Sequence, residues 1–296
     1  MPFRSLARAI AMLSLAAFGS LAAHAYDSIV VFGDSYNDVG NIYAASTALH
    51  NPYPPAPYYK GRFSNGPIWV EHIASDWGLP ITPSLLGGTD FAFGGAELLK
   101  PVVVEGLPIP SVPMQVDAYL ALNHGKADPN ALYVLEGGGN DILNATEFDP
   151  GKLGCAIATG IYELEKKLRG AGAKNFLVPD MINVGQLPAA GAGGAAFIKF
   201  ASDTSIHVNW ELAGLLDADM KLPGIHIYRL PVFQTFLAVG NATTHFGFTN
   251  VTTPCLSETL TVCSDPDHTL WWDAEHPTAF GHAFFAVLVE GRVPNQ

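Results

Sequence analysis

Charged side chains are scarce in this chain of 296 residues, at 14%, whereas hydrophobic residues make up 49%. Disordered chains combine low hydrophobicity with high charge, so the composition excludes that class and indicates a globular protein. Basic residues are the scarcer of the two signs, with 15 Lys and Arg against 27 Asp and Glu and a net charge of -12. A continuous basic surface for phosphates is therefore not expected, and nucleic acid is set aside as a partner.

Long hydrophobic runs are absent beyond the N-terminus. There, Arg4 and Arg8 precede an apolar stretch at 9–23 that ends in Ala23-His24-Ala25, the pattern of a secretory signal peptide. The alternative is a membrane anchor, but a span needs roughly 20 apolar residues, more than this stretch offers. We expect residues 1–25 to be removed, leaving a single domain at 26–296 without a transmembrane segment, in a secreted or periplasmic location.

Cysteine is also scarce, and the three cysteines cannot all pair within one chain. Cys255 and Cys263 lie eight residues apart in a stretch rich in Thr, Ser and Pro, which is typical of a loop. We expect a disulfide between them. Cys155 falls inside a helical pattern with no second Cys or His near it in the sequence, and it is expected to be a buried free thiol.

Apolar segments alternate with helical patterns along the rest of the chain. Segments rich in Val, Ile, Phe and Leu do not alternate with polar residues, so they predict strands buried on both faces. Strands that alternate with helices indicate a parallel sheet covered on both sides. The predicted strands are 28–32, 90–93, 131–135, 175–178 and 225–230, and the predicted helices are 67–77, 113–123, 150–168, 195–222 and 277–290.

The exit of the first strand carries Gly33-Asp34-Ser35. In parallel sheets functional groups gather where strands end, and a serine at such a turn can present its hydroxyl at the mouth of a cleft. The same tripeptide is also an ordinary turn, so it does not establish a nucleophile by itself.

A carboxylate and a histidine lie close together near the C-terminus, in Asp273-Ala274-Glu275-His276-Pro277. Pro277 disfavours helical geometry at His276, which places the histidine in a loop before the last helix. An acid three residues ahead can orient the imidazole toward a serine. Two alternatives stay open, a helix cap with a surface histidine and a metal site with His268 and His282, although the spacing differs from that of zinc proteases.

Two glycine-rich segments follow other strands. Gly137-Gly138-Gly139-Asn140-Asp141 lets the backbone approach a ligand closely, and the Asn140 amide could then donate to a developing oxyanion. Phe93-Gly94-Gly95-Ala96 could supply a backbone N–H as a second donor. A nucleotide-binding loop is not indicated, because neither segment has the lysine or the glycine spacing of such loops.

These segments together resemble the GDSL family, whose broader group is the SGNH hydrolases. The resemblance is carried by the segments 33–41, 90–96, 138–141 and 273–276, and 61–67 is similar to a stretch of the lipase-like members. The serine comes first and the acid and histidine come last, unlike the order in α/β-hydrolases. The chain departs from the family pattern at Tyr36, which replaces Leu, and at Asp90, where many members have Asn.

The resemblance implies a fold, a set of site residues and an activity. The implied fold is a three-layer α/β/α sandwich with a five-stranded parallel sheet, flavodoxin-like in arrangement. Ser35 would be the nucleophile, His276 the general base and then acid, and Asp273 its orienter. The N–H groups of Ser35 and Gly95, with the Asn140 amide, would form the oxyanion hole, although Gly94 is an alternative to Gly95.

The implied activity is hydrolysis of small-molecule or lipid carboxylic esters through an acyl-enzyme, without metal or cofactor. Two alternatives remain at this stage. An acyltransferase would use the same acyl-enzyme with an alcohol in place of water, and the sequence does not separate the two. A non-catalytic binding protein on the same scaffold is disfavoured because every required group is present.

Overall fold

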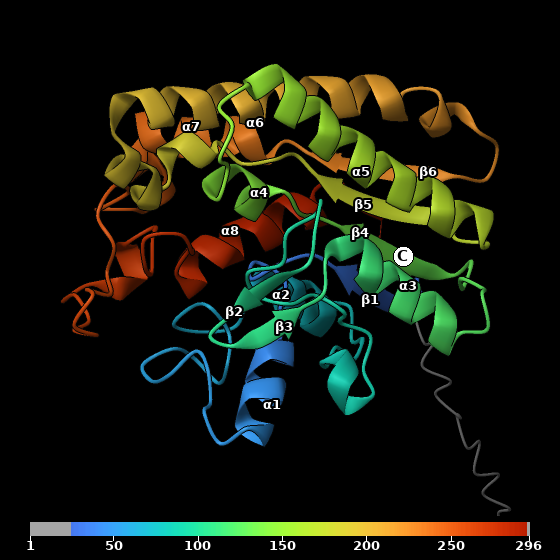
Figure 1. Cartoon of the computed structure of the whole chain (residues 1–296), viewed down its shortest axis with the longest axis horizontal. Helices are drawn as coiled ribbons and strands as arrows, with labels where there is room; N and C mark the ends of the chain where they lie inside the picture. Colours follow the sequence, from blue (N-terminus) through green and yellow to red (C-terminus); the bar gives the residue numbers. More distant parts are fainter. Residues whose placement is uncertain (1–24, 295–296) are drawn as a thin grey trace, which may run out of the picture.

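The computed structural model describes residues 25–294, so the predicted signal peptide lies outside the described residues except for Ala25. Four parallel strands form the central sheet in the order β1-β4-β5-β6 (Figure 1). Every residue of β4 is buried, as expected for a sheet that is covered on both faces. These strands are β1 (Ser28–Phe32), β4 (Ala131–Leu135), β5 (Asn175–Pro179) and β6 (His226–Leu230).

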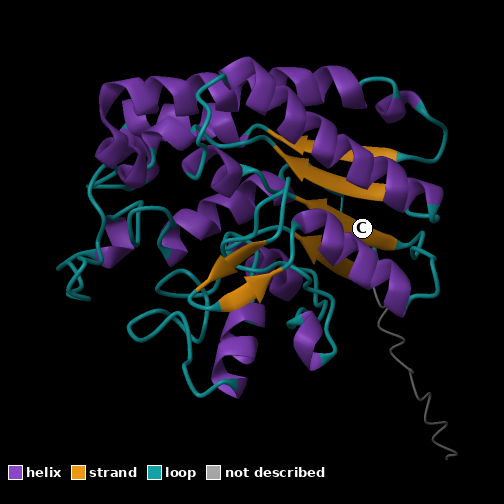
Figure 2. Ribbon diagram, in the orientation of Figure 1, coloured by secondary structure: helices purple, strands orange, loops and turns teal. Residues whose placement is uncertain are grey.

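Helices cover the sheet on both sides, which confirms the α/β/α sandwich (Figure 2). One group of helices consists of α5 packed against α6, with α3 next to α5. A second group consists of α2 packed against α8. Asp149 caps α5 by accepting from the Lys152 N–H at 3.0 Å, and Thr278 caps α8. The α-helices are α1 (Asn41–Ala48), α2 (Trp69–Asp76), α3 (Val112–Leu122), α4 (Gly139–Leu143), α5 (Pro150–Gly170), α6 (Gly194–Leu216), α7 (Val232–Asn241) and α8 (Ala279–Glu290).

The prediction of a fifth strand at 90–93 is wrong. Its backbone runs beside β1, with the Phe91 N–H donating to Val31 and the Phe93 N–H to Gly33, but only Asp90 forms a bridge. On its outer side, the amide of Asn41 donates to the carbonyl oxygens of residues 90 and 92. Side-chain hydrogen bonds thus take the place of a further ladder, and the segment turns away from the sheet.

Helices α1, α4 and α7 and a short antiparallel hairpin were not expected from the sequence. The hairpin consists of β2 (Val102–Val104) and β3 (Leu107–Ile109) and lies below and to the left of the sheet strands in Figure 1. Its six residues are too few to give a periodic signal. Within residues 25–294, we find no helix that combines the length and apolarity required to cross a membrane.

Candidate active site

The turn after β1 presents Ser35 at the carboxyl edge of the sheet. A Cβ atom on Gly33 would lie 2.2 Å from Nδ2 of Asn37, so the turn requires glycine there. The buried amide of Gln115 on α3 holds this glycine: Oε1 accepts from its N–H and Nε2 donates to its carbonyl oxygen, both at 2.9 Å. Gln115 was not among the predicted site residues, because it lies 82 positions away without a motif of its own.

Ser35 lies in contact with His276, although the two are 241 residues apart in the chain. The distance between the serine Oγ and the histidine Nε2 is 2.7 Å, and both residues are buried, with 6% and 7% of their surface exposed. This is the distance at which an imidazole can take the hydroxyl proton. The structure therefore brings the predicted nucleophile and base together.

Asp273 holds the other side of the imidazole. Its Oδ2 is 2.8 Å from Nδ1 of His276, and its Oδ1 accepts the backbone N–H groups of Glu275 and His276, both at 2.8 Å. The hydroxyl of Tyr58 also donates to Oδ2, at 2.7 Å. Tyr58 was missed by the sequence analysis, since it lies 215 residues away in a proline-rich loop. The two backbone N–H groups and Tyr58 thus hold the Asp273 carboxylate in place, and the carboxylate in turn orients the ring of His276.

Asp273 and His276 shift each other's pKa. Burial acts to raise the pKa of Asp273, but the charge of His276 and the hydrogen bonds outweigh it and lower the pKa to about 2. Burial acts to lower the pKa of His276, yet the Asp273 carboxylate outweighs it and the pKa is raised. The pair therefore stabilises the imidazolium that forms when the histidine accepts a proton.

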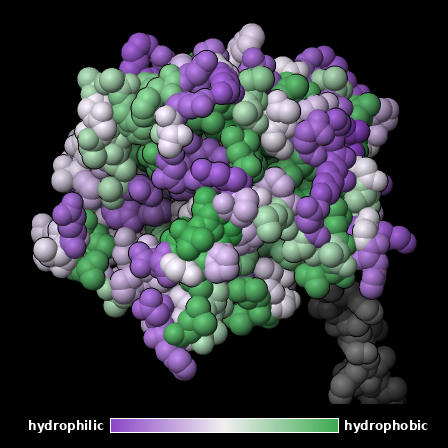
Figure 3. All heavy atoms as spheres, viewed as in Figure 1, coloured by the Kyte–Doolittle hydropathy of each residue, from purple (hydrophilic) through white to green (hydrophobic). Residues whose placement is uncertain are grey.

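The oxyanion donors predicted from the sequence gather around one cavity. Ser35, Gly95, Asn140 and His276 all line a cavity of about 240 Å³ next to hairpin β2–β3, which we call the hairpin cavity. The molecular surface is hollowed beside hydrophobic side chains at the position of the hairpin (Figure 3). The arrangement matches what the hydrolysis of an ester requires.

The structure distinguishes between the two adjacent glycines. The N–H of Gly94 donates to Oδ2 of the buried Asp38 at 2.9 Å and is therefore occupied. The N–H groups of Gly95 and Ser35 have no hydrogen-bond acceptor among the described residues 25–294. Gly95 also has a φ of 74°, a left-handed conformation that favours glycine. The geometry supports Gly95 over Gly94.

The Asn140 side chain is already oriented by the protein. Its Nδ2 donates to the carbonyl oxygen of Ala96 at 3.0 Å and to Oδ2 of Asp34 at 3.3 Å. Burial raises the pKa of Asp34 to about 6, in spite of the Tyr36 N–H and the charge of His276, which both act to lower it. The amide is thus fixed beside Ser35 before any substrate arrives.

Both departures from the family pattern have local partners. The hydroxyl of Tyr36 donates to the carbonyl oxygen of Glu275 at 2.6 Å, so the tyrosine ties the nucleophile turn to the histidine loop. The carboxylate of Asp90 accepts the N–H groups of Val39 at 2.7 Å and Ala92 at 3.0 Å. Asp90 therefore accepts local backbone hydrogen bonds at the position where many members of the family have Asn.

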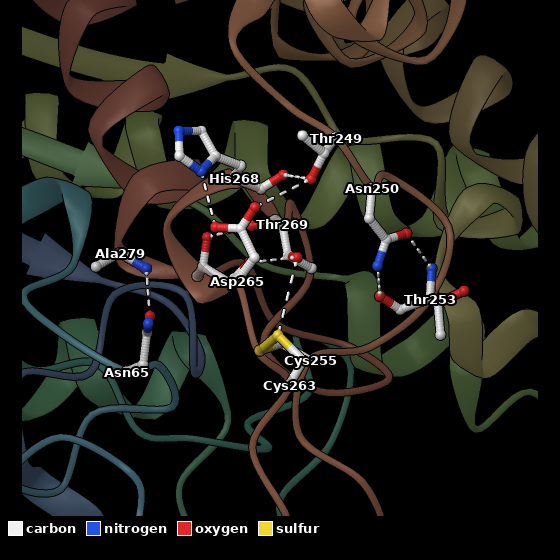
Figure 4. Close-up of a disulfide and its surroundings, with 11 residues drawn as sticks. Asn65, Thr249, Asn250, Thr253, Cys255, Cys263, Asp265, His268, Thr269 and Ala279 are labelled. Atoms are coloured by element: carbon white, nitrogen blue, oxygen red, sulfur yellow. Dashed lines mark hydrogen bonds and ion pairs between the residues drawn. A yellow bond between two sulfur atoms is a disulfide. The ribbon is translucent and has the colours of Figure 1, made fainter.

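Cys255 and Cys263 form the predicted disulfide (Figure 4). The N–H of Cys255 donates to the carbonyl oxygen of Trp271, and the Cys263 N–H donates to that of Cys255. Cys155 is a free thiol, but it is exposed, so the prediction of a buried thiol is wrong. The buried face of α5 runs through Gly154, Ile157 and Ala158, and Cys155 faces away from it.

The histidines considered for a metal site lie in unrelated surroundings. His268 is half exposed, with its Nδ1 2.7 Å from Oδ1 of Asp265, and Figure 4 shows this pair near the disulfide. His282 is buried, and its ring packs against Tyr36 and Phe285. Across residues 25–294, no three or more His, Cys, Asp or Glu side chains are grouped so that they could hold a metal ion.

Comparison with known proteins decides the family. The family model for GDSL-like lipase/acylhydrolase matches residues 29–289, which is nearly the whole chain. The chain belongs to this family. It is a carboxylic ester hydrolase of the GDSL type, as its similarity to a GDSL esterase/lipase of Arabidopsis thaliana also indicates, at 26% identity over 90% of this chain and 84% of that protein.

Two bacterial proteins are similar to this GDSL hydrolase over part of their length. The thermolabile hemolysin of Vibrio parahaemolyticus is 27% identical over 88% of this chain. The phosphatidylcholine-sterol acyltransferase of Aeromonas hydrophila is 31% identical over 64% of this chain. The chain spans 62% of the hemolysin and 54% of the acyltransferase.

Proposed function

We propose that this chain hydrolyses carboxylic esters through an acyl-enzyme on Ser35. The observation that carries the proposal is the continuous set of hydrogen bonds from Ser35 through His276 to Asp273, beside two free backbone N–H groups. A nucleophile, a base, an orienting acid and oxyanion donors are the groups that serine hydrolysis requires.

The first half of the reaction forms the acyl-enzyme. Oγ of Ser35 bonds to the ester carbonyl carbon while its proton passes to Nε2 of His276. The negative charge that develops on the carbonyl oxygen is stabilised by the N–H groups of Ser35 and Gly95 and by the Asn140 amide. When this intermediate collapses, the bond to the alcohol oxygen breaks, and His276 gives its proton to the leaving alcohol.

The second half of the reaction regenerates Ser35. A water molecule gives a proton to His276 and bonds to the acyl carbon, and the bond to Oγ then breaks as the histidine returns the proton. The carboxylic acid is released. Asp273 keeps its negative charge throughout, because its role is to hold the ring and stabilise the imidazolium.

The experiment that tests this proposal is labelling with a fluorophosphonate combined with an ester hydrolysis assay. The wild-type protein should be labelled once and should hydrolyse 4-nitrophenyl esters, whereas Ser35→Ala should do neither while keeping its circular dichroism spectrum. A wild-type protein that resists labelling would support the alternative of a binding protein. An Ala variant with near wild-type turnover would refute the assignment of Ser35.

Acyl transfer is the second candidate function, and the similarity to an acyltransferase of Aeromonas hydrophila favours it. In that reaction an alcohol takes the place of water in the second half. Product analysis with an added primary alcohol separates the two, since a transferase forms a new ester and a hydrolase forms the free acid. The two functions share the same triad.

We also propose that the chain is exported and folds as one domain from residue 26. The disulfide between Cys255 and Cys263 supports an oxidising compartment. Tyr26 is buried and its ring lies 5.8 Å from that of Trp77, so the proposed mature chain begins at a packed residue. The intact mass of exported protein should match a chain that begins at Tyr26, and a mass that includes residues 1–25 would refute the cleavage.

A further inference from the structure

A second pocket adjoins Ser35, separate from the hairpin cavity. It is bounded by the loop after β5, through Met181, Ile182, Val184 and Leu187, and we call it the strand-end pocket. Its free space is about 50 Å³, against about 240 Å³ for the hairpin cavity. Both are lined by Ser35, Asn140, Leu143, Glu275 and His276, so the two pockets meet at the nucleophile and can receive the two parts of an ester.

The walls of the strand-end pocket are apolar and fixed. Asn209 on α6 clamps Met181 through two hydrogen bonds, with Oδ1 accepting its N–H at 2.7 Å and Nδ2 donating to its carbonyl oxygen at 2.8 Å. The Val184 N–H donates to the buried hydroxyl of Ser205 at 3.1 Å. Because the loop is fastened to α6 at both points, the walls should not move apart to admit a longer group.

The floor of the strand-end pocket consists of carboxyl groups at three strand ends. Asp34 follows β1, Glu136 follows β4 and Asp180 follows β5, and all three line the pocket. Each already has a protein partner, namely the Tyr36 N–H, the Asn37 amide and the Arg229 guanidinium. Burial raises the pKa of Glu136, which fits an apolar site. Such a floor disfavours a second carboxylate on the substrate.

We propose that the strand-end pocket holds the acyl chain and restricts this enzyme to esters of short, uncharged acids, while the alcohol part lies in the hairpin cavity. This assignment rests on the acyl-enzyme proposed above. A volume of about 50 Å³ accommodates about four water-sized groups, so with the carbonyl carbon at Ser35 acids of up to about five carbons should fit. The hairpin cavity is larger and includes the polar Asn144, which the strand-end pocket lacks, so it can take alcohols of varied size.

The first test varies the two halves of the ester independently. With 4-nitrophenyl esters of unbranched acids, kcat/KM should be highest at or below about five carbons and at least tenfold lower at ten. With acetates of primary alcohols from two to eight carbons, kcat/KM should change less than threefold. Preference for acyl chains of eight carbons or more, or a steep dependence on the alcohol instead, would overturn the proposal while leaving ester hydrolysis intact.

The second test compares two acyl groups with the same number of carbons. The 4-nitrophenyl ester of butanoic acid should be hydrolysed at least a hundredfold more efficiently than the mono-4-nitrophenyl ester of succinic acid, which ends in a carboxylate. Equal rates on the two esters would contradict the claim that the carboxyl groups of the strand-end pocket exclude a charged acyl group. Loss of activity on both esters would instead refute the proposed function, so the two failures are distinguishable.

The third test changes the pocket wall. Ile182→Ala enlarges the strand-end pocket at a part-buried position and should raise the ratio of kcat/KM for octanoate to butanoate about tenfold. The matched control is Val103→Ala, which trims an exposed side chain of the hairpin cavity and should leave that ratio unchanged. Thermal unfolding of each variant verifies the fold, and Leu187→Ala, which lines the strand-end pocket and not the hairpin cavity, serves if Ile182→Ala fails to fold. An unchanged ratio in a folded wall variant, or an equal change in the control, would overturn the proposal.

Discussion

At the scale of single residues, we expect the protonation of His276 to govern the rate. The ring must be neutral to take the Ser35 proton, and the Asp273 carboxylate raises its pKa in spite of burial. We therefore expect kcat/KM to fall as pH drops through a pKa above 6.5, the usual value for histidine. The measurement is kcat/KM against pH with a neutral ester, and an acid limb centred below pH 6 would contradict the raised pKa.

Asp273 should act on the rate through His276. Replacing its carboxylate by an amide in Asp273→Asn places an N–H where Nδ1 now donates, which favours the wrong tautomer. A loss of about 10⁴ in kcat is the precedent for this change. Ser35 remains in the variant, so slow reaction with fluorophosphonate should persist. A loss smaller than tenfold would show that the carboxylate does not orient the ring.

Asn140 should act on the transition state alone. Removing one oxyanion donor usually costs about 10²- to 10³-fold in kcat, and we expect this for Asn140→Ala with KM nearly unchanged. Nδ2 of Asn140 donates to Ala96 and, at the longer distance of 3.3 Å, to Asp34, so one N–H has to exchange Asp34 for the oxyanion as the intermediate forms. Steady-state kinetics distinguish the outcomes, since a raised KM with unchanged kcat would indicate uniform substrate binding instead.

At the scale of elements, local patterns in the sequence predicted the four sheet strands, five helices and the residues that meet at the site. Contacts between distant segments could not be predicted. Gln115 and Tyr58 have no motif, and only the folded chain places them against Gly33 and Asp273. The choice of Gly95 likewise depended on Asp38, whose carboxylate occupies the neighbouring N–H.

The loop closed by Cys255 and Cys263 is an element whose contribution can be measured. Its nine residues should contribute about 2.6 kcal/mol to the free energy of unfolding in the chain-entropy model. Since the Leu256 N–H donates to the Trp272 carbonyl oxygen and the Trp272 N–H to that of His276, reduction should also loosen the catalytic segment.

We therefore expect reduced protein to lose activity at denaturant concentrations where it is still folded. Denaturant unfolding and ester hydrolysis, each with and without reductant, provide the measurement. The Cys155→Ser variant is the control, because its thiol is exposed and unpaired within residues 25–294. A decrease in stability well above about 2.6 kcal/mol, or both thiols free in oxidised protein, would contradict this account.

At the scale of the whole molecule, the free energy of unfolding depends on pH through buried side chains whose pKa values are shifted in opposite directions. Asp34 has its pKa raised to about 6, so the folded state binds its proton more readily than the unfolded state. Its contribution to stability is present at low pH and is lost as pH rises from about 4 to about 6. Asp273, with its pKa lowered to about 2, acts in the reverse direction, and its contribution is lost as pH falls from about 4 to about 2.

His282 is the group that should make the fold sensitive to mild acid. It is fully buried on α8, and neither ring nitrogen has a hydrogen-bond partner among residues 25–294. Burial lowers its pKa to about 3, with smaller effects from the charges of His276 and His72. The unfolded chain takes up this proton below about pH 6.5, whereas the folded chain does not. Lower pH therefore favours unfolding between about 6.5 and about 3.

The variant His282→Leu removes this titration and keeps an apolar side chain of similar size between Tyr36 and Phe285. At about 1.4 kcal/mol per pH unit, the wild type should lose on the order of 2 kcal/mol between pH 7 and pH 5 relative to the variant. Urea unfolding of both proteins at the two pH values measures the difference, and the exposed His207→Leu is the matched control. Since Asp34 and Asp273 titrate alike in all three proteins, their contributions cancel. A gap between wild type and variant that is the same at pH 5 and pH 7 would show that His282 binds its proton equally in both states.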